Sequence, residues 1–313
     1  MEKIINQYKE YLIIQGRSEN TIKNYMCDLN KFYNYFTGKN IEQIQIIDLM
    51  EYVKYIKYNG GRKNTEAKPR TINRNIVALK NFYKWMKKYG IIVTDYMQEI
   101  EFVSVPTNEE VIYMDVNEAK DFLNVIHTEG AKKKRILKDF TSLRDELMFK
   151  IYLETGLRSA ELSNVKINDI DLNEKKIKIL GKKNKIRYVA INDKTIELYK
   201  NYLPRRVKVN RKNKEYLLLS VKGNIMDNTD INDLIKQYLS MSNMDTSKAE
   251  KMSVHKLRHS YASIQYEQNT PTLAISKNMG HANPSITERI YIHFSNNKAL
   301  DLSRKNSEIL DDY

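Results

Sequence analysis

"KIKILGKKNKIRYVAI", residues 176–191, predicts a β-hairpin in a chain whose other segments are mostly helical in pattern. Polar and apolar residues alternate along 176–180, and β-branched and aromatic residues follow in 186–191, as in half-buried strands. The residues between the two strands begin with Gly181 and form the predicted turn. Residues 175–187 contain seven Lys or Arg and no acid. Such a run is usually a solvated face, but a rigid hairpin edge of this charge suits a DNA groove.

Composition limits the class of protein. The chain has 313 residues, enough for two domains or one large one. Hydrophobic residues make up 41% of it, so it can bury a core and is not a disordered tail. Lys and Arg outnumber Asp and Glu by 53 to 39, which gives a net charge of +14 and an isoelectric point near 9.4. This excess favours a polyanionic partner such as nucleic acid over a merely solvated basic surface.

Cysteine usage and hydropathy bear on location. Cys27 is the only cysteine, which excludes an intrachain disulfide and a cysteine-based zinc site. The opening residues, "MEKIINQYKEYL", mix acids and bases, unlike a secretory signal. No stretch approaches the roughly 20 apolar residues that a membrane span needs. We therefore expect a cytoplasmic protein with no membrane partner.

The N-terminal third is expected to be a helical domain, residues 1–104. Apolar residues recur at helical spacing in 18–36, with Ser18 as a candidate cap, and again in 46–58 and 71–90. This pattern predicts a small four-helix domain. The next segment lacks helical period and contains Pro106, so a linker is expected at residues 105–111.

Residues 112–313 are expected to form a second domain that mixes helices with the hairpin. The fold class is therefore mainly α with a small β-sheet or hairpin in the C-terminal domain (α+β). Helical spacing predicts further helices at 116–127, 135–154, 194–202, 229–240, 256–268 and 271–279, and in the tail after 296.

The N-terminal domain also has a basic rim. A Gly-Gly turn opens the loop "NGGRKNTEAKPR", residues 59–70. The side chains expected to hold DNA phosphates from this domain are Lys63, Lys68, Arg70 and Arg74, with a solvated loop as the alternative.

Four segments of the C-terminal domain carry groups that handle phosphate. They are "TGLRSAEL" (155–162), "LGKKNKIRYVAI" (180–191), "HKLRH" (255–259) and "MGHANPSITERIY" (279–291). Any one of them arises easily by chance, and an HxxR motif is weak by itself. Their combination in this order is far more specific.

Arginine, lysine, histidine and tyrosine side chains in these segments are the groups that metal-free cleavage of a DNA phosphodiester would need. Cutting DNA without a metal requires a side-chain oxygen that attacks phosphorus. Ionising a tyrosine hydroxyl at pH 7 costs roughly 4 kcal/mol, which a base or a positive pocket reduces. Two guanidiniums can clamp the non-bridging oxygens and stay charged throughout. In chain order, the candidate catalytic residues are Arg158, Lys182, His255, Arg258, His281 and Tyr291.

The order and local frames of these segments resemble the tyrosine recombinase (phage integrase) family, which shares its catalytic layout with type IB topoisomerases. "SENTIKNYMCDL" (18–29) is similar to the SAM-like core-binding domain of that family. The resemblance implies two domains that close around duplex DNA as a C-shaped clamp.

The resemblance also implies a role for each residue. Tyr291 is the nucleophile, His255 assists its proton transfer, and Lys182 protonates the departing 5′-oxygen. Arg158 and Arg258 clamp the phosphate, and His281 adds a donor. Glu161 is a further candidate, which orients Arg158 or a neighbour rather than reacting, or forms a plain helix-face ion pair. Lys183 and Lys185 are alternatives to Lys182 or DNA contacts.

The implied function is site-specific DNA recombination or integration, often by mobile genetic elements, through a 3′-phosphotyrosine and a Holliday junction. The expected assembly is a homotetramer on two DNA duplexes whose sites carry inverted repeats, with an accessory DNA-bending protein or partner recombinase as a further candidate. No metal, ATP or other cofactor is expected, since none of the ten glycines begins a Gly-Lys-Ser/Thr phosphate loop.

Four alternatives stay open at this point. Tyr291 by itself fits a core or surface tyrosine. His255 and His259 are four residues apart and fit a zinc site, against which Lys256 and the cation of Arg258 argue. The enzyme could nick and relax DNA like a topoisomerase, or the chain could be an architectural DNA-binding protein that does not cut. The tail "NKALDLSRKNSEIL" (297–310) could pack on its own chain or on a neighbouring subunit.

Overall fold

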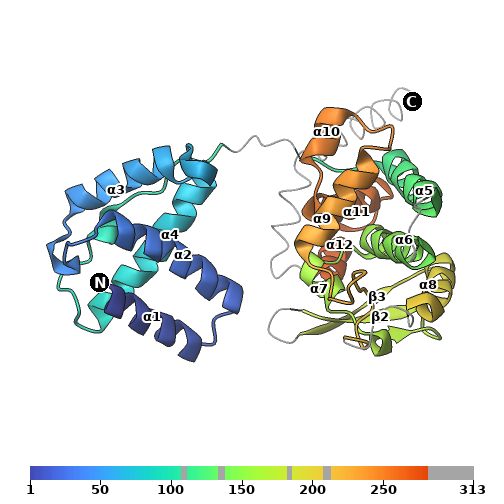
Figure 1. Ribbon diagram of the computed structural model, residues 1–313, viewed down its shortest axis with the longest axis horizontal. Coiled ribbons are helices and arrows are strands. Elements are labelled where there is room, and N and C mark those ends of the chain that lie inside the picture. Colours follow the sequence, from blue (N-terminus) through green and yellow to red (C-terminus); the bar gives the residue numbers. More distant parts are fainter. Residues whose placement is uncertain (107–110, 133–137, 182–184, 207–212, 281–313) are drawn as a thin grey trace, which may run out of the picture. The chain divides into compact units, whose positions relative to one another are not determined.

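The computed structural model describes residues 1–106, 111–132, 138–181, 185–206 and 213–280 (Figure 1). The chain divides into two compact units, Met1–Glu109 and Glu110–Tyr313, and each is described by itself. The division lies inside the segment 105–111 that the sequence predicts as a linker.

The N-terminal unit is helical. Its helices are α1 (Glu2–Ile14), α2 (Glu19–Tyr35), α3 (Ile46–Asn59) and α4 (Pro69–Lys88). Short 3₁₀ turns precede and follow α3, η1 (Ile41–Gln43) and η2 (Arg62–Asn64), and a third, η3 (Tyr96–Glu99), follows α4. Ser18 caps α2 by accepting a hydrogen bond from the backbone N–H of Thr21 at 3.3 Å, as its sequence context predicts. Pro69 occupies the first turn of α4, where no intrahelical donor is lost.

Aromatic side chains form much of the core of this unit. Tyr8, Phe32, Tyr52 and Phe82 are all fully buried, and Phe32 meets the ring of Tyr52 edge-on at 5.1 Å. Trp85 is also buried, on the long apolar face of α4. Burial of rings of this size stabilises a small helical domain strongly, and edge-on pairs add to it.

The C-terminal unit consists of helices around one small sheet. Its helices are α5 (Val116–Lys132), α6 (Lys138–Thr155), α7 (Ser159–Ser163), α8 (Asp193–Arg206), α9 (Asn228–Leu239), α10 (Thr246–Lys251), α11 (Val254–Glu267) and α12 (Thr272–Met279), with a 3₁₀ turn η4 at Ile167–Asp169. The helix α6 packs against α5, α8 and α11 (Figure 1). Its centre includes Leu147, Phe149 and Tyr152, which are buried in the main core of the unit. The predicted helices that fall on described residues are confirmed, and α7 and α10 are additional. The helix predicted in the tail after residue 296 lies outside the described residues, as does the start of the segment predicted at 135–154.

The predicted hairpin is confirmed. Strands β2 (Lys176–Leu180) and β3 (Ile186–Ala190) pair antiparallel, with Lys176 opposite Ala190 and Leu180 opposite Ile186. Ile177 and Ile179 are buried while the residues between and beside them face outward, as the alternation requires. A short strand β1 (Ile170–Asp171), not predicted, pairs with the outer side of β2.

Two glycines shape the loops beside the sheet. Gly156, between α6 and α7, has φ +61°, and a Cβ there would lie 2.3 Å from the ring of Tyr261. Gly280 ends α12 in the left-handed conformation, with φ +66°. Both positions require glycine, because other residues are strained there and the space at Gly156 is filled.

Within the described ranges, no helix combines the length and the hydropathy that crossing a bilayer demands.

Candidate active site

Arg158 lies at the N-cap of the short helix α7, where the predicted "TGLR" segment ends. Its Nη1 donates to Oε1 of Glu161 at 2.9 Å, and its Nη2 donates to the carbonyl of Gly280 at 3.0 Å. Its backbone N–H donates to Oε2 of Glu161 at 2.9 Å. The side chain is 40% exposed, so its guanidinium is open to a ligand in solution.

Arg258 lies on α11 and is almost completely buried, with 6% of its surface exposed. Its Nη1 donates to the carbonyl of Gly156 and its Nη2 to the carbonyl of Met279, both at 2.7 Å. Burial, and then the positive charge of Arg158, lower the pKa of Arg258 to about 9. The structure thus brings the two predicted phosphate-clamping arginines into one site, although 100 residues separate them in the sequence.

Glu161 is the buried anion of the site. Burial acts to raise the pKa of its carboxyl, but hydrogen bonds from Arg187 and from the backbone N–H of Arg158 hold the pKa below its ordinary value. The carboxylate is therefore charged, and it forms ion pairs with Arg158 and with Arg187. These contacts fit both predicted roles, the orientation of Arg158 or a neighbour and an ion pair on the helix face. The carboxylate lies 4.0 Å from Nη1 of Arg258 as well.

Arg187 on β3 is a member of the site that the sequence analysis did not single out. Its Nη1 and Nη2 donate to Oε1 and Oε2 of Glu161 at 2.9 and 2.7 Å, a bidentate pair. Its Nε donates to the carbonyl of Asn278 at 3.0 Å. The signal that could have revealed it is modest: it is the last cation of the basic run 175–187 and the only arginine in it.

The C-terminal end of α12 is held by these arginines. The carbonyls of Asn278, Met279 and Gly280 accept from Arg187, Arg258 and Arg158, respectively. The last carbonyls of a helix lack intrahelical partners and form the negative end of its dipole, so cations stabilise them. The predicted residue His281 follows Gly280 directly in the sequence but lies outside the described residues, as do Lys182, Lys183 and Tyr291.

The two histidines of "HKLRH" differ in environment. His255 is exposed on α11, accessible to a substrate. His259 is mostly buried, and burial, followed by Lys256 and His255, lowers its pKa to about 4. His259 is therefore neutral at pH 7, and its buried Nδ1 has no hydrogen-bond partner among the described residues. Among all the residues that the structure describes, no three His, Cys, Asp or Glu side chains are grouped to hold a metal ion.

The predicted DNA-contacting residues of the N-terminal unit fall into two groups. Lys63, Lys68 and Arg70 are exposed, and Lys63 has φ +56° within η2. Arg74 instead donates through Nε and Nη2 to both carboxylate oxygens of the buried Asp28, at 3.0 and 2.8 Å. On the hairpin of the other unit, Lys185 is exposed.

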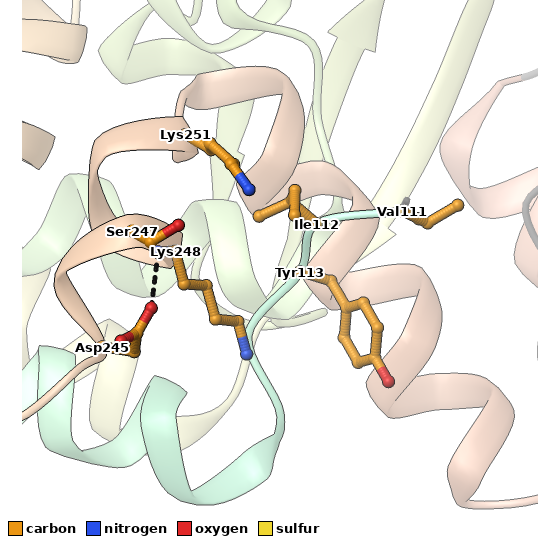
Figure 2. A pocket seen from close by; sticks show the side chains of 7 residues that line it. All are labelled: Val111, Ile112, Tyr113, Asp245, Ser247, Lys248 and Lys251. Carbon is orange, nitrogen blue, oxygen red and sulfur yellow. Dashed lines mark hydrogen bonds between the residues drawn. The ribbon is translucent and has the colours of Figure 1, made fainter. Parts of the chain in front are cut away.

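A pocket of 340 Å³ lies elsewhere in the C-terminal unit, between residues 111–113 and α10 (Figure 2). The ammonium of Lys248 beside it is paired with Glu118 at 2.6 Å and lies 5.6 Å from the ring centre of Tyr113. None of the predicted site residues lines this pocket.

Two family models and several curated proteins match this chain. Residues 113–298 match the model of the phage integrase family, and residues 5–90 match that of the phage integrase N-terminal SAM-like domain. The tyrosine recombinase XerC of Caldanaerobacter subterraneus subsp. tengcongensis is 29% identical over 327 residues, which cover 98% of this chain and 86% of that protein. The tyrosine recombinase XerC of Staphylococcus epidermidis is 28% identical over 302 residues, 95% of this chain and 94% of that protein.

Solved structures share the fold. The XerH site-specific recombinase in a post-cleavage complex with palindromic difH substrate has a TM-score of 0.72 and 24% identity, covering 92% of this chain and 80% of that chain. The Tn1549 transposon integrase in complex with circular intermediate DNA has a TM-score of 0.68 and 16% identity, covering 92% and 94%. The family model matches residues 113–298, which are more than half of the chain and include Arg158, Arg187 and Arg258. The family suggested by the four sequence segments is therefore confirmed: this protein belongs to the phage integrase family, the tyrosine recombinases.

Proposed function

We propose that this protein is a site-specific DNA recombinase that cuts and rejoins duplex DNA through a 3′-phosphotyrosine at Tyr291. The observation that carries the proposal is the site at Glu161, where the guanidiniums of Arg158, Arg187 and Arg258 surround one buried carboxylate. Three cations against one anion leave an excess of positive charge. A preorganised positive site of this kind stabilises the negative charge that builds up on a phosphorane.

The two clamping arginines differ in what they offer the phosphate. Arg158 is 40% exposed, and a non-bridging oxygen can reach its guanidinium directly. Arg258 is buried, with one N–H of each terminal nitrogen on a carbonyl, so its position is fixed before substrate arrives. A guanidinium has five N–H donors, so both arginines keep donors for the phosphate.

The remaining steps are assigned to residues by their place in the family motifs. The phenolic oxygen of Tyr291 attacks phosphorus and forms the phosphotyrosine bond, while its proton passes toward His255. The bond from phosphorus to the 5′-oxygen breaks, and Lys182 protonates that oxygen. His281 donates to the phosphate. The phosphodiester energy is kept in the covalent link, so a 5′-hydroxyl of another strand reseals the break without ATP or a metal ion.

The domain roles and the assembly are part of the proposal. Residues 1–104 bind DNA, 105–111 link, and 112–313 carry the catalytic site, the two domains closing on the duplex as a clamp. Lys63, Lys68 and Arg70 contact phosphates, as do Lys183 and Lys185. Four protomers act on two duplexes in the cytoplasm, at sites with inverted repeats, with an accessory DNA-bending protein or a partner recombinase as a further component. The names of the related proteins, which include recombinases and a transposon integrase bound to DNA, support this picture.

The test uses nicked duplexes that tile the DNA flanking the gene. A nick beside the cleavage point releases the 5′-hydroxyl strand and traps the covalent complex. The wild-type protein is expected to form this complex in the presence of EDTA. Tyr291→Phe should form none, whereas the control Tyr313→Phe should behave as wild type. A covalent complex that persists in Tyr291→Phe, or cleavage that demands magnesium, would overturn the proposal. Exchange of strands between two duplexes distinguishes a recombinase from an enzyme that only relaxes DNA.

A further inference from the structure

The carboxylate of Glu161 is shared unequally between two arginines. Arg187 donates to both of its oxygens from both terminal nitrogens, at 2.9 and 2.7 Å. Arg158 contributes only one side-chain nitrogen, Nη1, at 2.9 Å, and uses its other terminal nitrogen on the carbonyl of Gly280. The main side-chain partner of the anion is therefore Arg187, while Arg158 gives it one side-chain and one backbone hydrogen bond.

The side chains of Arg187 and Arg158 also differ in how deeply they are buried. The side chain of Arg187 is 15% exposed and that of Arg158 is 40% exposed. The Nε, Nη1 and Nη2 atoms of Arg187 are all engaged, on Asn278 and Glu161. Arg187 thus faces into the protein, while Arg158 is the one that a DNA phosphate can reach.

A buried carboxylate that lost Arg187 would need another partner. An unpaired buried charge is costly, so the nearest cation would turn to it. The candidates are Arg158, already bonded through Nη1, and Arg258, whose Nη1 is 4.0 Å from Oε2. Either change draws away an arginine that the proposed chemistry assigns to the phosphate.

We propose that Arg187 is a positioning residue: by satisfying Glu161, it leaves Arg158 free to bind the scissile phosphate. This inference rests on the proposed function. According to this inference, Arg187 does not contact DNA. The effect of an Arg187 substitution on the cleavage rate should therefore depend on whether Glu161 is charged.

The surroundings of Arg187 support this role. A Cβ on Gly280 would lie 2.8 Å from its Nη1, and a Cβ on Gly181 would lie 3.5 Å from the same atom. The guanidinium thus occupies the space that a side chain at Gly280 would need, and it lies within van der Waals range of a Cβ at Gly181. These two glycines directly precede His281 and Lys182 in the sequence. One side chain therefore contacts the hairpin end, the α7 turn and the end of α12, and each of these segments carries or precedes a residue of the proposed machinery.

The experiment compares Arg187→Gln, Glu161→Gln and the double variant in single-turnover cleavage of the nicked duplex at saturating DNA. Arg187→Gln is expected to lose about 10²-fold in rate, the cost of misplacing a reacting group by ~1 Å. The double variant has no carboxylate to capture Arg158. It should regain about tenfold over Arg187→Gln, within the coupling found for residues of one ion-pair network.

Salt dependence separates positioning from phosphate contact. Because Glu161→Gln removes the carboxylate that would capture Arg158, the double variant should keep the slope of log K against log[salt] of Glu161→Gln, while Arg158→Gln should lose about 0.9 units for one phosphate contact. Arg187→Lys keeps the charge but not the bidentate geometry, so its cleavage rate should fall less than that of Arg187→Gln. It also provides the test if the glutamine variant does not fold.

The matched control is Arg206→Gln: this arginine is 3% exposed and donates to the carbonyl of Leu217 at 3.1 Å. It should lower stability without changing the cleavage rate of the folded protein.

The outcomes are distinct. A double variant no faster than Arg187→Gln, with losses that simply add, would assign Arg187 a purely structural role and overturn the inference. The inference is also overturned if Arg187→Gln and Arg187→Lys both cleave at the wild-type rate, or if the double variant has a smaller salt slope than Glu161→Gln. Failure of the wild-type protein to form any covalent complex would instead overturn the proposed function.

Discussion

Nη2 of Arg258 donates to the carbonyl of Met279 at 2.7 Å and so ties α11 to the end of α12. The same guanidinium donates from Nη1 to Gly156, in the turn between α6 and α7. A single buried side chain therefore joins three segments that are distant in sequence. The positive charge of Arg258 and both of its terminal nitrogens are used, so another residue of similar size could not replace it.

Arg258→Lys tests this double contact. Lysine keeps a positive charge but offers one ammonium group, which cannot reach both carbonyls. The free energy of unfolding should fall by about 1.5–3 kcal/mol, as for the loss of a charged hydrogen bond. Cleavage should fall by about 10²–10³-fold, as when one donor to a transition-state oxygen is removed. Urea unfolding and single-turnover cleavage measure the two effects. The control is Arg205→Lys: Arg205 is exposed on α8 and donates to the carbonyl of Asn201 in the same helix. A wild-type rate in Arg258→Lys would contradict the assignment.

Gly156→Ala tests the crowding beside the site. The new Cβ would lie 2.3 Å from Cδ1 of Tyr261, in addition to the strain of φ +61°. The free energy of unfolding should fall by about 3 kcal/mol or more, from backbone strain together with overpacking. Gly90→Ala has a similar φ of +71° with no atom within 4 Å, so it should cost only the backbone part, about 1–2 kcal/mol. Equal losses in the two variants, measured by urea unfolding, would rule out the steric explanation.

Arg74→Gln separates stability from DNA binding in the N-terminal unit. Arg74 is 47% exposed, but it is bonded to the carboxylate of Asp28, which is 1% exposed. Its loss should cost about 2 kcal/mol, below the ~3–5 kcal/mol of a fully buried pair because water screens Arg74. Lys68→Gln should instead leave stability unchanged and reduce the salt slope of DNA binding by about 0.9. If Arg74→Gln changed the salt slope with no loss of stability, its main role would be phosphate contact.

His259→Gln tests the pH dependence of stability. Burial lowers the pKa of His259 to about 4, whereas the unfolded chain keeps the ordinary value of about 6.5. Between these values the unfolded state binds a proton that the folded state does not, so acidification favours unfolding. Below pH 6.5 the wild-type protein should progressively lose stability, up to about 3 kcal/mol near pH 4 from this group. His259→Gln should lose correspondingly less between pH 7 and 4.5 by urea unfolding. His127→Gln, which removes a histidine that is 69% exposed, serves as the control. Parallel pH curves for wild type and His259→Gln would contradict the assignment.

Elements with enough residues to show a period could be predicted from the sequence. The strands expected at 176–180 and 186–191 are β2 and β3, and the helix expected at 71–90 is α4 (Pro69–Lys88). Shorter elements could not be predicted in this way. The helix α7 has five residues and the strand β1 has two, too few for one apolar face to repeat. Their conformation depends on neighbours, such as the pairing of β1 with β2.

The sequence by itself determined the fold class, the family, and the local pair of Arg158 and Glu161, because three residues along one helical turn place side chains in reach of each other. Only the tertiary structure decided that Arg187 is the main partner of Glu161. The basic run in the sequence shows only that residue 187 is a cation. The partners of Arg187, Glu161 and Asn278, are 26 and 91 residues away in the sequence. Which carboxylate a guanidinium meets is decided where packing brings distant segments together and excludes water. Neither condition can be read from the order of residues along the chain.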